Sequence, residues 1–362
     1  PFERTEPREP CARVEPLRRP LFGDLHVHSS YSFDSYTSGQ RNDPWGAYLY
    51  ATGEPIALPG VGDDDVRRAQ LARPLDFAAV TDHAETLGEI DLCTGPEWSL
   101  ATFTPLCVLT RSDNFFAALV AAGWWSEMIG EAKAERERIW QCGLPGSDCE
   151  RRQRDFWGHI QQAAEDFYDR TSECRFTTFV GYEYTDTPNF DNMHRNVIFR
   201  NDRVVERPIS AVDTGSENFP ELWRRLRSEC IEAGTGCDVI AIPHNSNLAG
   251  GRMFRDPRSA LEARERLFFE PVVELVQHKA SSECRFDRLL GRGVATADEL
   301  CTFEQNKTDS LQSLAVLFGE VQSAAGAPSP LHEIAPRNLL RNVLKDGLAV
   351  ERARGTNQSK VG

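Results

Sequence analysis

The sequence contains the segment FGDLHVHSSYSFD at residues 22–34, in which two histidines alternate with apolar residues. On a β-strand, residues i and i+2 point to the same face. His26 and His28 are therefore expected to direct two imidazoles at one point, which is a common beginning of a metal site. Asp24 and Asp34 place carboxylate oxygens nearby, and Asp34 is a candidate ligand. The plainer interpretation is a half-exposed strand with incidental histidines, as holds for many isolated His-x-His motifs.

Four later segments share one arrangement, an apolar strand pattern with a potential metal ligand at or near one end. In α/β barrels and open α/β sheets, functional groups gather at the carboxyl ends of the strands. We therefore expect the candidate ligands of these four segments to converge with His26 and His28. The four segments and their candidate ligands are 75–83 with His83, 175–185 with Glu183, 194–199 with His194, and 238–245 with His244.

The order of these motifs resembles that of the PHP (polymerase and histidinol phosphatase) superfamily. The chain more closely resembles an uncharacterised bacterial family of PHP-like proteins with Phe-Gly-Asp-Leu-His-Val-His, Thr-Asp-His-Ala-Glu, Ile-Pro-His-Asn and Gln-His-Lys motifs, over about residues 21–347. The resemblance implies an α/β fold, a distorted (β/α)7 TIM-like barrel, with a cluster of two or three divalent metal ions. Asp34 stands where many superfamily members have a third histidine, and a carboxylate there can still bind zinc, manganese or iron. The other implied ligands are His26, His28, His83, Glu183, His194 and His244.

One superfamily feature is missing from the chain. PHP proteins end with an Asp-x-His motif on the last strand, which supplies two further ligands, and no such motif follows His244. We interpret this difference as a C-terminal strand missing from the chain as given. We then expect partial metal occupancy and little activity until the strand is restored. The alternative is a site that is incomplete in the natural protein.

Five further residues are candidates for contact with substrate or for catalysis. Asp82 adjoins a predicted ligand and is expected to orient it or to take part in catalysis, with metal ligation by Asp82 itself as the alternative. Arg195 and Asn245 each follow a predicted ligand and are expected to bind substrate, with Arg195 also a catalytic candidate. His278 and Lys279 close a later apolar segment, where His278 could act as an acid and Lys279 could bind an anion. A surface histidine and lysine without a role are the alternative.

The predicted ligand set favours hydrolysis. Imidazoles mixed with carboxylates suit zinc, manganese or iron better than calcium. Neighbouring ions that share a bridging carboxylate activate water and hold a phosphoryl group during displacement. We therefore predict a metal-dependent hydrolase, most simply a phosphoesterase; no Gly-x-Ser-x-Gly, Walker or dinucleotide motif is present. The alternatives are an amidohydrolase-type barrel that cleaves C–N or C–O bonds, and a non-catalytic binding protein stabilised by metal.

The composition limits the class of partner. The 362 residues are 40% apolar and 27% charged, as in globular proteins. No apolar run approaches the ~20 residues that a membrane helix needs. The net charge of −14 argues against a nucleic-acid partner, because phosphate backbones bind basic surfaces. The expected partner is a small, anionic substrate drawn to the metal ions.

The ten cysteines indicate an oxidising compartment. None lies in a Cys-x-x-Cys pair, so a zinc ribbon is not indicated. An even count with several close pairs predicts disulfides, and hence a periplasmic or secreted protein, although the connectivity is open. Reduced, buried thiols in a cytoplasmic protein are the alternative. The pairs close in sequence are Cys93 with Cys107, Cys142 with Cys149, Cys230 with Cys237, and Cys284 with Cys301.

The chain is expected to form one large domain. Residues 1–20 are predicted to be an extended arm, and residues 21–362 the metal-dependent hydrolase barrel. Residues from about 91 to 174 exceed what a barrel crossover needs and are expected to add a helical cap beside the barrel mouth. Apolar spacing predicts helices at 44–51, 114–140, 151–168, 219–233, 310–324 and 336–350.

Overall fold

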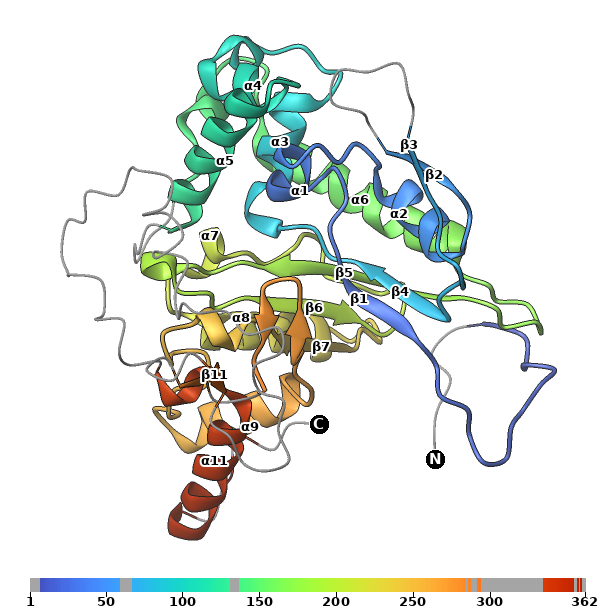
Figure 1. Cartoon of the computed structure of the whole chain (residues 1–362), viewed down its shortest axis with the longest axis vertical. Helices are drawn as coiled ribbons and strands as arrows, with labels where there is room; N and C mark the ends of the chain where they lie inside the picture. Colours follow the sequence, from blue (N-terminus) through green and yellow to red (C-terminus); the bar gives the residue numbers. More distant parts are fainter. Residues whose placement is uncertain are drawn as a thin grey trace.

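The computed structural model of the chain is built around a curled sheet of five strands (Figure 1). It describes residues 7–58, 67–130, 137–283, 286–287, 292–293 and 335–354, together with residues 357 and 359. The strand order is β1-β4-β5-β6-β7, and each of the five predicted strand segments supplies one strand. The bounds are Gly23–Val27 for β1, Phe77–Val80 for β4, Thr177–Tyr184 for β5, Arg195–Phe199 for β6 and Val239–Pro243 for β7.

The directions of the strands decide which ends meet. β1, β4 and β5 pair in parallel, whereas β6 pairs antiparallel with both β5 and β7. β7 therefore runs in the same direction as β5. As a result, the amino end of β6 lies at the same edge of the sheet as the carboxyl ends of the other four strands.

The predicted distorted (β/α)7 barrel is wrong for the described residues, where the mixed α/β fold has an open half-barrel sheet. Residues 185–194 alone separate β5 from β6, and a parallel neighbour needs a crossover of about a dozen residues or more. β6 therefore turns back. The apolar segment 272–279, which could have extended the sheet, instead forms β8 (Val276–Gln277), paired in a hairpin with β9 (Ala280–Ser281).

Successive side chains of each strand point to opposite faces of the sheet, and the apolar ones form two separate clusters. One face of the sheet contributes to a large core with helices α2, α6 and α8, whose bounds are Pro44–Ala51, Cys149–Phe167 and Phe219–Leu226. The other face carries a small cluster, formed by Ala79, Ile198 and Ile242 with the half-buried Leu25, Phe179, Ile240 and Val272. All three helices thus cover the same face of the sheet. Because the sheet curls, α2 and α6 lie on one side of it in the view and α8 lies on the other (Figure 1).

The long segment between β4 and β5 is helical, as predicted. Its last helix, α6, packs on β4 and β5 and so serves as their crossover connection. The predicted helix at 114–140 is shorter: the structure describes α5 over Phe115–Gly130, residues 137–139 are not helical, and residues 140–143 form a 3-10 turn. The predicted helix at 310–324 lies outside the described residues. The remaining α-helices are α1 (Phe33–Thr37), α3 (Leu87–Thr94), α4 (Pro105–Thr110), α5 (Phe115–Gly130), α7 (Ala211–Thr214), α9 (Ala260–Phe269) and α11 (Leu340–Arg354).

Three short pairings complete the described strands, and none of them joins the central sheet. They are β2 (Ile56–Leu58) with β3 (Arg67–Ala69), β8 with β9, and β10 (Phe286–Asp287) with β11 (Arg292–Gly293). Among the described residues, no helix combines the length and the apolar character that crossing a bilayer requires.

Four disulfides connect described cysteines, so the prediction of disulfide bonding is confirmed. Three of them join pairs that are close in sequence, and the fourth ties the N-terminal arm to the loop before β5. Cys284 and Cys301 lie outside the described residues. The bonds are Cys93–Cys107, Cys142–Cys149, Cys230–Cys237 and Cys11–Cys174, with Cα–Cα distances of 4.5, 5.4, 5.0 and 5.6 Å.

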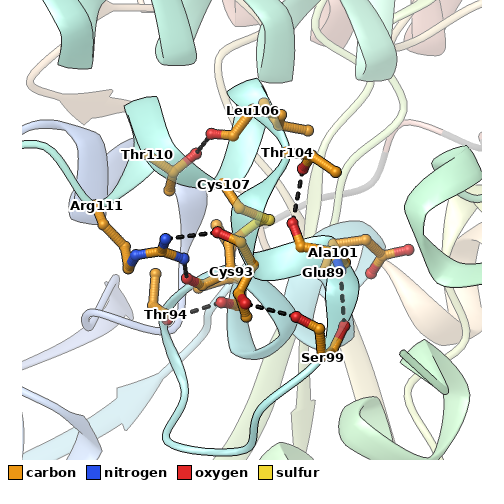
Figure 2. Close-up of a disulfide and its surroundings, with 12 residues drawn as sticks. Glu89, Cys93, Thr94, Ser99, Ala101, Thr104, Leu106, Cys107, Thr110 and Arg111 are labelled. Carbon is orange, nitrogen blue, oxygen red and sulfur yellow. Dashed lines mark hydrogen bonds between the residues drawn. A yellow bond between two sulfur atoms is a disulfide. The ribbon is translucent and has the colours of Figure 1, made fainter. Parts of the chain in front are cut away.

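Figure 2 shows how one disulfide fixes the start of the helical segment. Cys93 near the end of α3 is bonded to Cys107 in α4. The Arg111 guanidinium donates to the carbonyl oxygens of Cys93 at 2.5 Å and Thr102 at 2.6 Å. The bond to Cys93 satisfies a carbonyl group at the C-terminal end of α3, where the helix itself offers no donors, and the bond to Thr102 links this end to the 3-10 turn at residues 100–103.

Candidate metal centre

The carboxylate of Glu183 lies at the centre of five imidazoles. Glu183 is fully buried near the end of β5, and its two oxygens face different histidines. The Oε2 atom lies 3.3 Å from His26 Nε2 and 2.7 Å from His28 Nε2. The Oε1 atom lies 2.6 Å from His194 Nδ1, 3.0 Å from His244 Nε2 and 3.6 Å from His83 Nδ1. The structure therefore brings all five predicted histidine ligands to one shared carboxylate.

The strand directions explain this convergence. Four of the histidines lie at or just after the carboxyl ends of β1, β4 and β7, whereas His194 precedes β6. Because β6 is antiparallel to its neighbours, its amino end lies at the same edge of the sheet. A histidine that opens a strand and histidines that close strands thus meet at one place.

Two groups of three residues have donor atoms close enough to hold a metal ion. His26, Glu183 and His244 form the first group, and His28, Asp34 and His83 form the second, with donor atoms within 4.8 Å of one another in each. Asp34 Oδ2 lies 3.1 Å from His28 Nδ1 and 3.4 Å from His83 Nε2. Glu89, Cys142 and Cys149 are equally close, but their cysteines form a disulfide and offer no thiolate.

The geometry around Glu183 fits a bound cation. Nitrogens of His194, His28 and His244 lie 2.6, 2.7 and 3.0 Å from the Glu183 oxygens. Several imidazoles that converge on one buried carboxylate form a set of donors suited to a cation. Neutral imidazole nitrogens and carboxylate oxygens are the donors that zinc, manganese and iron accept. The residues present therefore fit divalent metal ions.

The ionisation of the centre follows from burial and close charges. Burial lowers the pKa of His194 to about 4 and that of His244 to about 3, so both are neutral near pH 7, as metal ligands must be. Burial would raise the pKa of Glu183, but His83, His244 and His194 outweigh it and hold that pKa well below its usual value. Burial opposes protonation of His28, but Asp34 and Glu183 raise its pKa well above normal.

The sequence as a whole was compared with protein families, curated proteins and solved structures. The family model "Protein of unknown function (DUF3604)" matches residues 15–362. The chain belongs to the DUF3604 family. No curated protein and no solved structure shows a significant match.

Asp82 of this DUF3604 chain is placed beside the centre, where it holds a loop. Its two carboxylate oxygens accept hydrogen bonds from Ser29 N at 2.6 Å and Ser29 Oγ at 2.7 Å. Burial raises the pKa of Asp82 to about 6, even though these hydrogen bonds oppose the rise. Because Ser29 follows His28, Asp82 fixes the backbone that carries this histidine. A part in the chemistry itself stays a prediction.

Arg195 lies on the opposite face of the sheet from His194. Neighbouring residues on a strand point to opposite faces, and Arg195 shares its face with Val197 in the large core. Its guanidinium donates to Glu270 Oε1 and to the Met193 carbonyl, both at 2.6 Å, and stacks on Phe219. The structure therefore places Arg195 in a buried ion pair and does not bring it to the imidazoles.

Asn245, His278 and Lys279 lie together beside the centre. Asn245 has a left-handed backbone conformation, with φ of 57°, and its Oδ1 accepts a hydrogen bond from Gln277 Nε2. His278 and Lys279 form the turn of the β8–β9 hairpin, and the Lys279 carbonyl accepts from Asn247 Nδ2 at 2.9 Å. Burial and the charges of Lys279, His26 and His28 lower the pKa of His278.

The sequence analysis missed one carboxylate at the centre, that of Glu274. Its Oε2 lies 2.7 Å from His26 Nδ1, and its backbone N donates to the Pro243 carbonyl at 3.0 Å. The signal was a single acidic residue inside an otherwise apolar run at 272–276. An isolated acid in such a run is a candidate for a buried polar contact, because an unpaired carboxylate is costly to bury.

Proposed function

We propose that this DUF3604 chain is a metal-dependent hydrolase that binds two or three divalent ions, zinc, manganese or iron, and most simply cleaves phosphate esters. One observation carries the proposal: the buried carboxylate of Glu183 lies within 3.6 Å of all five imidazoles, and each of its oxygens faces more than one of them. A carboxylate shared in this way is the arrangement expected of a bridging ligand between neighbouring ions. The motif order that resembles the PHP superfamily supports the phosphoesterase activity.

Each residue at the centre then has a definite task. Bound divalent ions supply Lewis acidity, which makes water a nucleophile near neutral pH. The buried histidines His194 and His244 stay neutral and present lone pairs, while Glu183 stays ionised and joins the two sets of ligands. His278, exposed at the hairpin turn, would give a proton to a leaving group, and because its pKa is lowered it would do so best at acidic pH. Lys279 and Asn245 would bind the anionic part of the substrate.

The proposed metal ions, rather than the net charge of the protein, support an anionic substrate. The net charge of −14 repels anions from most of the surface. Divalent ions and Lys279 at the centre would create a local positive potential, so an anion is expected to bind there. The four disulfides support a periplasmic or secreted location, because such bonds persist in oxidising compartments.

The test is metal analysis of the full-length protein, followed by a hydrolysis screen with p-nitrophenyl phosphate, bis(p-nitrophenyl) phosphate and a panel of amides and lactones. We expect at least two bound ions and turnover of a phosphate ester, lost on chelation and restored by manganese or zinc. Turnover of amides or lactones alone would favour the amidohydrolase alternative. Full metal occupancy without turnover of any substrate would favour a non-catalytic binding protein.

Replacing Lys279 tests the predicted anion contact. We expect Lys279→Ala to raise KM for a phosphate ester about 10-fold with a small change in kcat, because one charge-assisted contact is worth roughly 1.5–3 kcal/mol at most. Lys345→Ala is the matched control, since Lys345 is exposed on α11. An equal KM for Lys279→Ala and the unmodified enzyme would contradict the assignment.

A further inference from the structure

The imidazole of His26 is held between two carboxylates. Its Nε2 lies 3.3 Å from Glu183 Oε2, and its Nδ1 lies 2.7 Å from Glu274 Oε2. The two nitrogens therefore have different carboxylate partners. One nitrogen faces the shared carboxylate of the proposed metal centre, and the other faces a carboxylate outside the group formed by His26, Glu183 and His244.

The fold holds Glu274 firmly in this position. Its backbone N donates to the carbonyl of Pro243, the last residue of β7, so the segment after α9 lies beside the end of this strand. Ser282 N in turn donates to the Leu275 carbonyl at 2.7 Å, which anchors the hairpin that follows. The Glu274 side chain is 20% exposed, and its Oε2 lies within hydrogen-bonding distance of His26 Nδ1. Glu274 is therefore a carboxylate acceptor at a fixed place.

Of the other histidines, His28 also lies between two carboxylates, those of Asp34 and Glu183, and the rest have weaker support. His194 Nε2 contacts the hydroxyl of Thr187 at 2.8 Å, and His83 Nδ1 contacts the hydroxyl of Thr185. His244 Nδ1 makes no hydrogen bond in the described structure. Among the described residues, His26 is thus the one histidine of the group formed by His26, Glu183 and His244 whose second nitrogen contacts a further carboxylate.

We propose that Glu274 is a positioning residue that acts through His26, and that it sets the metal affinity of the group formed by His26, Glu183 and His244. Its carboxylate accepts a hydrogen bond from the Nδ1–H group of His26. The Nε2 lone pair of His26 is then directed at the ion. A carboxylate behind a ligating imidazole fixes the tautomer and the ring orientation and raises the basicity of the ligand. This inference rests on the proposed metal centre and adds a residue that the ligand motifs do not contain.

The test is a zinc titration against a competing chelator, which needs no substrate. Glu274→Gln keeps the size of the side chain but removes its charge. We expect zinc affinity to fall about 10- to 100-fold, the usual effect of losing such a partner. Glu274→Asp keeps the charge and should recover part of the affinity. Glu283→Gln removes the same charge from an exposed position nearby, where Glu283 pairs with Arg341, and should leave the affinity unchanged.

A double-mutant cycle separates positioning from direct ligation. In a His26→Ala background, Glu274→Gln should cause no further loss of zinc affinity, because the residue that it supports is gone. A further loss in that background would overturn the positioning role. If the unmodified protein binds zinc and Glu274→Gln binds it equally well, the role of Glu274 is wrong but the proposed metal centre stands. If the unmodified protein binds no divalent ion at all, the proposed metal centre fails first.

Discussion

Glu183→Gln is expected to abolish high-affinity metal binding and hydrolysis together. The carboxylate lies 2.6–3.6 Å from nitrogen atoms of all five imidazoles, and each of its oxygens faces more than one of them. An amide offers one weaker, neutral oxygen and cannot bridge two cations. Because a supporting partner alone costs 10- to 100-fold in affinity, loss of the shared ligand should cost more than about 100-fold. Zinc titration and phosphate-ester turnover measure both effects.

The matched control is Glu173→Gln, in the loop before β5. Glu173 is exposed and pairs with Arg175, so the same change there should leave metal binding and turnover intact. Circular dichroism of the metal-free proteins checks that Glu183→Gln still folds. A folded Glu183→Gln variant that retains its metal ions would contradict the bridging role, and Glu183→Asp should retain part of the affinity.

Arg195→Met is expected to lower the free energy of unfolding by about 3–5 kcal/mol, the usual result of removing one partner from a buried ion pair. Both Arg195 and Glu270 are fully buried, and the bond between them is 2.6 Å long. The substitution leaves the Glu270 carboxylate without its closest guanidinium, which a more distant Arg266 at 3.5 Å does not replace. Urea unfolding of the metal-free protein measures the loss.

The matched control for this prediction is Arg200→Met, just after β6. Arg200 pairs with Asp238 near the surface, and exposed pairs contribute about 0–1 kcal/mol. Kinetics of Arg195→Lys address the predicted role in substrate binding, because lysine keeps a positive charge. If Arg195→Lys folds normally but raises KM selectively, the residue contacts substrate after all, and the buried-pair assignment is wrong.

The candidate ligands could be predicted from sequence because each one is tied to a local pattern. An apolar run that ends in Thr-Asp-His or Pro-His places a polar side chain at a strand end whatever the strand pairs with. The same reasoning correctly located the strands that became β4, β5, β6 and β7. Likewise, closely spaced cysteines such as Cys142 and Cys149 pair locally, whereas Cys11 and Cys174 are joined only by the fold.

The predicted barrel failed because strand direction is not a local property. Alternation of apolar and polar residues is the same in parallel and antiparallel strands, so the pattern of 194–199 did not show that β6 reverses. The short connection at residues 185–194 was the available signal. The resemblance to a barrel superfamily implied a parallel strand at this position instead.

The sequence by itself determined which side chains are available as ligands and that they lie at strand ends, since both follow from residue type and from periodicity within a few residues. The tertiary structure alone decided three things. It brought His194 to the common edge by reversing β6, it turned Arg195 to the opposite face beside Glu270, and it added Glu274 from a segment after β7. These outcomes depend on contacts between residues far apart in the chain, and such contacts are set by packing and strand pairing rather than by local pattern.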